Sequence, residues 1–162
     1  MSISEGDRLP EATLLRVGDA GPEEVRLSDL TAGRRIVLIG MPGAFTSTCT
    51  EEHMPSFVRT AGAFADKGID EIVCVVVNDP FVAKAWAQVS GAEGAGITVL
   101  SDASGAYTQD LGLSFDAPPA GFYGRAVRHA MIVRDGTVET LQVEEGRGVC
   151  ELTAGETLLE KV

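Results

Sequence analysis

The chain has 162 residues, a length typical of one folded domain. Its 13 basic and 24 acidic side chains give a formal net charge of −11, which argues against nucleic acid and anionic membrane surfaces as partners. With 44% hydrophobic residues it can build an ordinary core, and its apolar runs are too short to cross a bilayer.

The chain contains three cysteines and no C-x-x-C pair. This odd number argues against the disulfide framework of a secreted protein and favours reduced thiols. The N-terminal sequence has no basic segment followed by an apolar one, so a secretory signal is not indicated. We therefore expect a cytoplasmic protein. Two histidines leave little material for a metal site, and we expect no metal and no other cofactor.

Short β-branched runs predict buried strands. The three clearest are Arg35–Met41 (RIVLIGM), residues 71–78 (EIVCVVVN) and residues 97–101 (ITVLS). Such runs are typical of strands in the middle of a sheet covered on both faces by helices. Further on, Asp135-Gly136 separates two more strand patterns, and Asp-Gly is a strong hairpin signal because both turn positions need a positive φ.

A long helical pattern covers residues 48–67. Thr48 and Glu51 have the spacing of a capping box, which would place Cys49 in the first turn. Pro55 lacks an N–H group and crowds the preceding turn, so we expect it to kink this helix.

Other helices are predicted where Asp79 precedes Pro80, over residues 104–111, and after Thr153, which has Glu156 three positions later. Strands and helices then follow one another as strand–helix–strand–helix–strand–helix–hairpin–helix. This order predicts an α/β domain with a mixed sheet, parallel in its first part and antiparallel in the hairpin.

Cys49 is the residue whose predicted position most favours chemical reactivity. At a helix start its thiol would meet unpaired backbone N–H groups and the positive end of the helix dipole, which both favour a thiolate. Lowering the pKa of a thiol from about 8.5 to about 6 requires about 3.4 kcal/mol, whereas a helix terminus supplies at most about 2 kcal/mol. Glu51 and Glu52 oppose the charge, so a cation must come from elsewhere in the chain. The position of Cys49 alone is equally compatible with a structural role, in which the thiol is simply a small buried hydrophobic side chain.

The string PGAFTSTCTEEHMPSFV contains Pro42-x-x-x-Thr46-x-x-Cys49 and resembles the active-site signature of the peroxiredoxins, in particular their Prx5 (type II) subfamily. The similarity continues in order through Asn78-Asp79-Pro80-Phe81-Val82, Trp86, Leu100-Ser101-Asp102, Gly105-Ala106 and Arg125-x-x-Arg128. It covers nearly the whole chain. The resemblance implies one thioredoxin-like domain over residues 1–162, with a central mixed sheet flanked by helices and a C-terminal hairpin and helix.

The resemblance also implies a role for each matching residue. Cys49 matches the peroxidatic cysteine, whose thiolate attacks the terminal peroxide oxygen and becomes a sulfenic acid. Thr46 matches the residue whose hydroxyl bonds peroxide and thiolate, and Pro42 the residue that shields the site from water. Arg128 matches the arginine that holds the thiolate and the peroxide, and it would supply the missing cation. Without the resemblance, Arg128 is better interpreted as a strand-surface side chain in a weak ion pair.

The implied function is a thiol-dependent peroxidase for antioxidant defence and redox homeostasis. Hydrogen peroxide and organic hydroperoxides would be reduced to water and alcohols. The reductant would be glutaredoxin with glutathione, or thioredoxin, and relatives of this kind form homodimers.

The other two cysteines each leave two interpretations open. Cys74 alternates with Ile72 and Val76, which favours a buried strand residue, while relatives often carry a secondary thiol at this point. Cys150 lies in a Gly-rich polar loop (EGRGVCE), which favours exposure. It is either a resolving cysteine, as in some Prx5 relatives, or a free surface thiol.

His53 follows Cys49 by one helical turn, as in an acid–base dyad or half of a metal site. No further ligand is evident, and we assign His53 no catalytic role. The side chain of His129 is expected on the opposite face from Arg128. Six apolar residues are expected mostly in the core, with a subset near the mouth of the Cys49 site forming a dimer contact: Met41, Phe45, Phe81, Phe115, Phe122 and Tyr123.

Three other functions compete with the peroxidase. A thioredoxin-like thiol–disulfide oxidoreductase needs a nearby partner thiol, but Glu52 and Thr46 occupy the C-x-x-C positions on either side of Cys49. A cysteine hydrolase needs an imidazole within hydrogen-bond reach of the sulfur and a group that orients it. A redox-inactive binding module on the same fold would have no need for the whole peroxidatic set.

Overall fold

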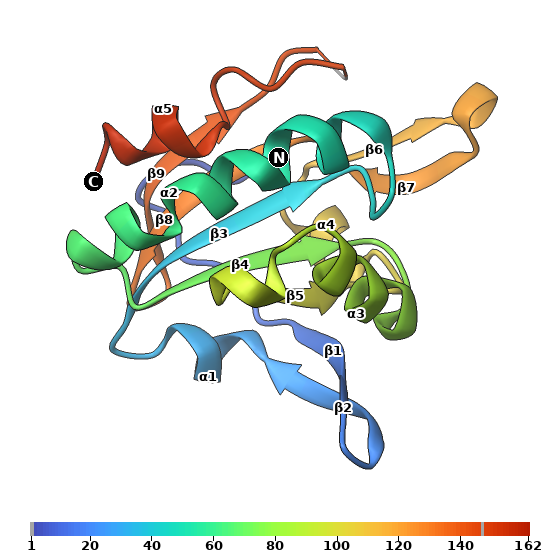
Figure 1. Cartoon of the computed structure of the whole chain (residues 1–162), viewed down its shortest axis with the longest axis horizontal. Helices are drawn as coiled ribbons and strands as arrows, with labels where there is room; N and C mark the ends of the chain where they lie inside the picture. The colour runs from blue at the N-terminus through green and yellow to red at the C-terminus, as the bar shows by residue number, and fades with distance from the viewer. Residues whose placement is uncertain (1, 147) are drawn as a thin grey trace.

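The computed structural model describes residues 2–146 and 148–162. Its centre is a seven-stranded mixed sheet in the order β2-β1-β5-β4-β3-β8-β9 (Figure 1). The strands are β1 (Thr13–Gly18), β2 (Gly21–Arg26), β3 (Arg35–Met41), β4 (Glu71–Val76), β5 (Thr98–Ser101), β8 (His129–Arg134) and β9 (Thr137–Val143). The pairs β3–β4 and β4–β5 are parallel and the other pairs are antiparallel, which confirms the predicted mixed sheet.

Helices cover both faces of this sheet. The helical segments of the described residues are α1 (Leu27–Thr31), η1 (Cys49–His53), α2 (Met54–Asp66), α3 (Pro80–Val89), η2 (Glu93–Ala95), α4 (Ala106–Asp110), η3 (Pro118–Ala120) and α5 (Gly155–Leu159). On β3, the side chains of Val37 and Ile39 enter one buried cluster, together with α2, α3 and α5. Ile36 and Leu38 enter a second cluster with α1 and α4. Both faces of β3 are therefore buried, as its unbroken apolar run predicts.

A separate two-stranded sheet formed by β6 (Ser114–Ala117) and β7 (Phe122–Ala126) extends from the end of the central sheet at which β3 ends (Figure 1). The sequence did not reveal these strands, nor the β1–β2 hairpin. Strand β2 (GPEEVR) is an edge strand with mostly exposed side chains, so it carries little hydrophobic pattern. The Asp135-Gly136 hairpin is confirmed, with φ values of 48° and 81°.

Two predicted helix caps are wrong. Thr48 already has helical backbone angles and its side chain makes no capping bond, so the Thr48–Glu51 capping box does not form. The final helix begins after Ala154, and the Thr153 hydroxyl donates to Glu144 instead. The Asp79 cap is confirmed, since its carboxylate accepts the N–H of Val82 at 2.9 Å.

The interruption expected at Pro55 takes the form of a π-helical turn. The turn spans η1, and the N–H of Met54 bonds to the carbonyl of Cys49, five residues earlier. Pro55 then lies in the first turn of α2, directly after the widened turn, and it has no N–H group to donate to that turn. The widened turn therefore carries Cys49 and His53 at its two ends.

Candidate active site

The loop that leads from β3 to Cys49 is held from two sides. The N–H of Ala44 donates to Asn78 Oδ1 at 2.9 Å, and Arg125 Nη1 donates to the carbonyl of Pro42, also at 2.9 Å. A Cβ atom on Gly43 would lie 2.3 Å from Arg125 Nη1, so only glycine permits this approach. The loop is thus anchored both to the end of β4 and to β7.

Phe45 and Thr46 turn this loop into the helix. Phe45 has a φ of 64°, a left-handed conformation that costs a non-glycine residue on the order of 1–3 kcal/mol. The Thr46 hydroxyl donates to the carbonyl of Gly43 at 2.8 Å, and the N–H of Thr50 donates to the carbonyl of Thr46 at 3.0 Å, which begins the helix. Cys49 consequently lies in the first helical turn, as predicted.

Cys49 is fully buried and has a guanidinium beside it. Arg128 Nη1 donates to Cys49 Sγ at 3.4 Å, and the Arg128 side chain is itself buried. The cation that the sequence requires is therefore present at the sulfur, and the interpretation of Arg128 as a surface strand residue is wrong. Arg128 Nε is buried without a hydrogen-bond partner among the described residues. That N–H remains available to an incoming oxygen.

His53 makes buried contacts that the sequence did not predict. It is buried, with Nε2 3.0 Å from the carbonyl oxygen of Thr153 and Nδ1 3.1 Å from Arg128 Nη1. Burial, reinforced by the charge of Arg128, lowers the pKa of His53 to about 3, so the imidazole is neutral. The spacing from Cys49 placed His53 on the correct helix face, but its partners lie 75 and 100 positions away.

Pro42, Thr46 and Arg128 line a common cavity. It has a volume of about 270 Å³, and Phe115 and Phe122 of the β6–β7 hairpin form part of its wall. The two rings meet edge to face with centroids 6.2 Å apart. Three of the four residues predicted for catalysis thus border one hollow, and the fourth, Cys49, accepts a hydrogen bond from Arg128, which belongs to its lining.

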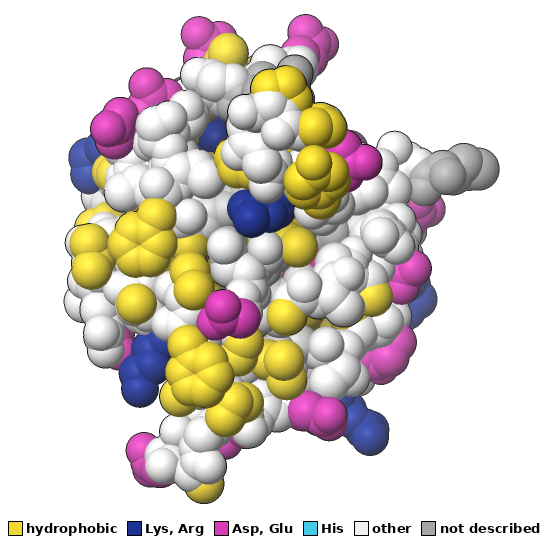
Figure 2. Space-filling view, turned by 90° about the vertical axis from the view of Figure 1, so that its right-hand side faces the viewer, with side chains coloured by type: hydrophobic (Ala, Val, Ile, Leu, Met, Phe, Trp, Pro, Cys, Tyr) yellow, Lys and Arg dark blue, Asp and Glu magenta, His cyan; other side chains and the backbone are white. Residues whose placement is uncertain are grey.

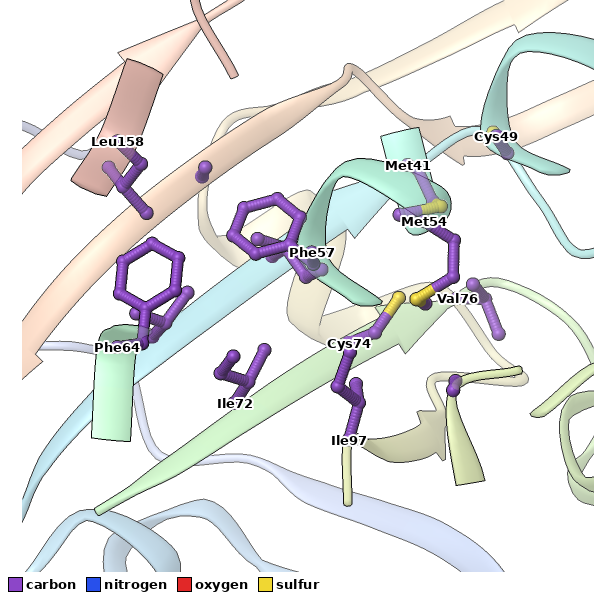
Figure 3. Packing of buried hydrophobic residues seen from close by; sticks show 14 of the residues in the cluster. Met41, Cys49, Met54, Phe57, Phe64, Ile72, Cys74, Val76, Ile97 and Leu158 are labelled. Carbon is purple, nitrogen blue, oxygen red and sulfur yellow. The ribbon is translucent and has the colours of Figure 1, made fainter. Parts of the chain in front are cut away.

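Cys74 belongs to the same buried cluster as Cys49 (Figure 3). Its side chain is fully buried beside that of Met54, and burial, followed by the nearby Cys49, raises the pKa of the Cys74 thiol. The prediction that Cys74 is a buried strand residue is confirmed.

Cys150 is half-buried, less exposed than its loop sequence predicts. Its Sγ lies 3.9 Å from Thr153 Oγ1, and burial raises the pKa of this thiol as well. Cys150 borders a groove of about 540 Å³ that is also lined by Glu51 and Glu52, which follow Cys49 closely in the chain. All three cysteines are free thiols.

Three of the aromatic residues expected in the core are exposed at this end of the molecule. Phe45, Phe81 and Tyr123 are 53%, 60% and 66% exposed, whereas Met41 is buried. Figure 2 faces this end and shows hydrophobic side chains spread over it between isolated charges. The prediction that these three residues lie in the core is wrong. The alternative prediction, that some of them form a contact between subunits, remains.

No group of three or more His, Cys, Asp or Glu side chains suited to a metal ion occurs in residues 2–146 and 148–162. In the same part of the chain, no helix has the length and apolar character needed to span a membrane.

A thioredoxin-like α/β fold that buries one cysteine at a helix start, against an arginine, defines a thiol redox protein. The model of the Redoxin family matches residues 4–159. Chloroplastic peroxiredoxin-2E-2 of Oryza sativa subsp. japonica is 42% identical over 161 residues, covering 97% of this chain and 72% of that protein.

Solved structures agree with this match. Reduced Prx3 from Vibrio vulnificus, in complex with hydrogen peroxide, is 41% identical with a TM-score of 0.90 and covers 98% of both chains. Peroxiredoxin 5 from Alvinella pompejana is 26% identical with a TM-score of 0.83, covering 98% of this chain and 96% of the other. The chain belongs to the redoxin family and, within it, to the peroxiredoxins, which are thiol-dependent peroxidases acting on hydroperoxides.

Proposed function

We propose that this peroxiredoxin reduces hydrogen peroxide and organic hydroperoxides at Cys49, with Arg128, Thr46 and Pro42 completing the site. The observation that carries the assignment is the 3.4 Å contact between Arg128 Nη1 and Cys49 Sγ in a buried setting. An arginine that touches a sulfur without solvent between them favours the thiolate, which is the nucleophile.

The chemical step joins sulfur to oxygen. The Cys49 thiolate attacks the terminal peroxide oxygen, an S–O bond forms, and the O–O bond breaks. The attacked oxygen keeps its hydrogen in the sulfenic acid, and the leaving hydroxide or alkoxide takes a proton from solvent to give water or an alcohol. The two electrons come from the sulfur.

Most of the acceleration must arise in this transition state. An ordinary thiol is already about 3% ionised at pH 7, so full ionisation gains only about 30-fold, or roughly 2 kcal/mol. Negative charge moves to the departing oxygen, and the free N–H of Arg128 Nε is a preorganised donor for it. The Thr46 hydroxyl, whose hydrogen is directed to Gly43, presents its oxygen as an acceptor for the O–H of the peroxide. Pro42 excludes water.

One assay tests the assignment: peroxide loss against stoichiometric reduced protein in a stopped-flow instrument. We expect a fast single turnover that Cys49→Ser abolishes and Cys150→Ser preserves. An intact thiol that consumes no peroxide would remove the peroxidase assignment.

Two routes of recycling are proposed. In one, Cys150 resolves the Cys49 sulfenic acid as a disulfide that thioredoxin reduces; in the other, glutathione and glutaredoxin act on Cys49 directly. Cys49 is fully buried, so either route requires the first helical turn to open. Mass spectrometry without reductant, after one equivalent of peroxide, separates the routes: a Cys49–Cys150 disulfide supports the first and a glutathione adduct on Cys49 the second.

We further propose a homodimer that uses the exposed aromatic end of the molecule. Phe45, Phe81 and Tyr123 are large apolar side chains exposed around the loop that holds the site. The double substitution of Phe81→Glu and Tyr123→Glu should shift sedimentation from dimer to monomer. A wild-type protein that sediments as a monomer would end this proposal.

We propose the cytoplasm as the location, supported by the three free thiols. Cell fractionation of the intact protein tests this directly.

A further inference from the structure

We propose that Trp86 is a positioning residue for the recycling of Cys49: its hydrogen bond to Thr50 holds the turn that carries Cys49 closed, and this bond must break before a reducing thiol can reach the sulfur. The inference rests on the peroxidase function proposed for Cys49. It assigns a role to the single tryptophan of the chain, which the chemistry above does not use.

The bond joins two segments that lie far apart in the sequence. Trp86 Nε1 lies 3.1 Å from Thr50 Oγ1. An indole N–H can only donate, so the threonine oxygen is the acceptor. Trp86 is fully buried, in the same cluster as Cys49 and Met54. A buried N–H that loses its partner is costly because water does not replace the acceptor, so the indole favours the closed turn.

Helix α3 provides a fixed support for this bond. The Asp79 carboxylate caps its first turn by accepting the N–H of Val82 at 2.9 Å. Ala83 and Trp86 of α3 are buried, and the helix packs against β1 and β5 of the central sheet. An opening confined to η1 therefore leaves Trp86 in place and takes the hydroxyl of Thr50 away from it.

The contact with Trp86 differs in kind from the other bonds of this turn. In the described part of the chain, three side chains of η1 form hydrogen bonds with other elements: Cys49, Thr50 and His53. Cys49 and His53 both contact Arg128, whereas Thr50 contacts α3. Once the thiolate has become a sulfenic acid, the sulfur no longer carries the negative charge that attracts the guanidinium. The bond between Thr50 and Trp86 has no ionised partner, so it persists after oxidation and becomes a larger share of what keeps the turn closed.

The step that this bond delays is the condensation of the Cys49 sulfenic acid with a thiol. An S–S bond forms, the S–O bond breaks, and the hydroxyl leaves as water with the proton of the thiol. Cys49 is fully buried in the closed turn, so the observed rate of this step is the fraction of open turns multiplied by the rate in the open form.

Thr50 offers a matched pair of substitutions. Valine has the shape of threonine without the hydroxyl, so Thr50→Val removes the acceptor and leaves Trp86 itself unchanged. Thr50→Ser keeps the hydroxyl and serves as the control. All proteins also carry Cys150→Ser, so that added glutathione is the only thiol that can react with the sulfenic acid.

The readouts are hydrogen exchange of the Cys49–His53 amides in the reduced protein and the rate at which glutathione attacks Cys49 after one equivalent of hydrogen peroxide. We expect Thr50→Val to raise both by roughly 5–10-fold, the equilibrium effect of one lost hydrogen bond. The closed form still predominates, so its first turnover with peroxide should stay within about twofold of the parent. Thr50→Ser should match the parent in every readout.

Three results would overturn the proposal. The first is a Thr50→Val variant with the exchange and the glutathione rate of the parent. The second is a Thr50→Ser variant that behaves like Thr50→Val, since the hydroxyl would then be irrelevant. The third is an equal rise in exchange at the amides of β4, which would indicate a general loss of stability and no specific effect on the turn.

A further measurement needs no variant. In the reduced wild-type protein, the indole N–H of Trp86 should be protected and should exchange at about the rate of the Cys49–His53 amides, because one opening frees both. An indole hydrogen that exchanges freely while these amides stay protected would refute the role. This measurement uses no peroxide, whereas wild-type protein that leaves peroxide unreacted would refute the peroxidase function, so the two failures are distinct.

Discussion

Arg128 Nη1 donates to Cys49 Sγ across 79 positions of sequence, and both side chains are buried. The contact combines a full charge with a directed hydrogen bond. Arg128→Lys keeps the charge but lacks the planar guanidinium, whose several N–H groups can contact the sulfur, His53 and an incoming oxygen together.

We expect Arg128→Lys to lower kcat/KM for hydrogen peroxide by roughly 10²–10³-fold, the usual cost of one lost transition-state donor. Arg134→Lys is the matched control, because Arg134 is exposed and pairs only with Glu139 among the contacts described. Stopped-flow kinetics of both variants check this. A lysine at position 128 with the parent rate would show that charge alone suffices.

Thr46 is expected to act on the rate and not on the ionisation of the sulfur. Its hydroxyl donates to Gly43, and no described contact joins it to Cys49. Thr46→Val removes the acceptor for the peroxide O–H and should therefore reduce kcat/KM roughly 10²-fold, while the pH midpoint of thiolate absorbance stays in place. Thr46→Ser should recover most of the rate. A Val variant as fast as wild type would exclude Thr46 from the reaction.

Gly43 is required by the approach of Arg125 to the loop. A methyl group at Gly43 would lie 2.3 Å from Arg125 Nη1, so Gly43→Ala must displace the arginine from the Pro42 carbonyl. We expect a loss of activity together with a free energy of unfolding lower by about 1–3 kcal/mol.

Gly62→Ala provides the comparison. Gly62 lies within α2, and a Cβ there meets nothing within 4 Å, so alanine should stabilise the helix by about 0.5–1 kcal/mol. Urea unfolding measures both variants. Equal stability changes at the two glycines would contradict the steric argument.

His53 makes the stability of the protein depend on pH. Burial and Arg128 lower the pKa of His53 to about 3, against about 6.5 in the unfolded chain. Between these values the unfolded state binds one more proton, so the contribution of neutral His53 is complete above about pH 6.5 and is lost as the pH falls toward 3.

From pH 7 to pH 5, wild type should therefore lose up to roughly 2 kcal/mol more stability than His53→Asn. Burial also lowers the pKa of His129, but His129 is present in both proteins and its effect cancels. Parallel urea denaturation at the two pH values provides the measurement. Identical losses in both proteins would mean that His53 titrates normally in the folded state.

Prediction from the sequence failed where the outcome depends on the three-dimensional surroundings of a residue and not on its neighbours in the chain. Thr48 and Thr153 have the local spacing of helix caps, but Thr153 is held by Glu144, which is close in space only. Phe81 and Tyr123 are apolar, and composition alone cannot tell a core aromatic from one left at the surface. The β1–β2 hairpin was missed because an exposed edge strand has little hydrophobic alternation to detect.

The sequence by itself determined the strands β3, β4 and β5, the Asp135-Gly136 hairpin and the placement of Cys49 in a first helical turn, because these depend on neighbouring residues. It also required a distant cation for Cys49, from a balance of charge. Only the tertiary structure decided that Arg128, His53 and Thr153 meet, since hydrogen bonds between residues 75 or more positions apart leave no local pattern in a single chain. The neutral state of His53 follows from that meeting, because burial and the charge of Arg128 lower the pKa of the imidazole.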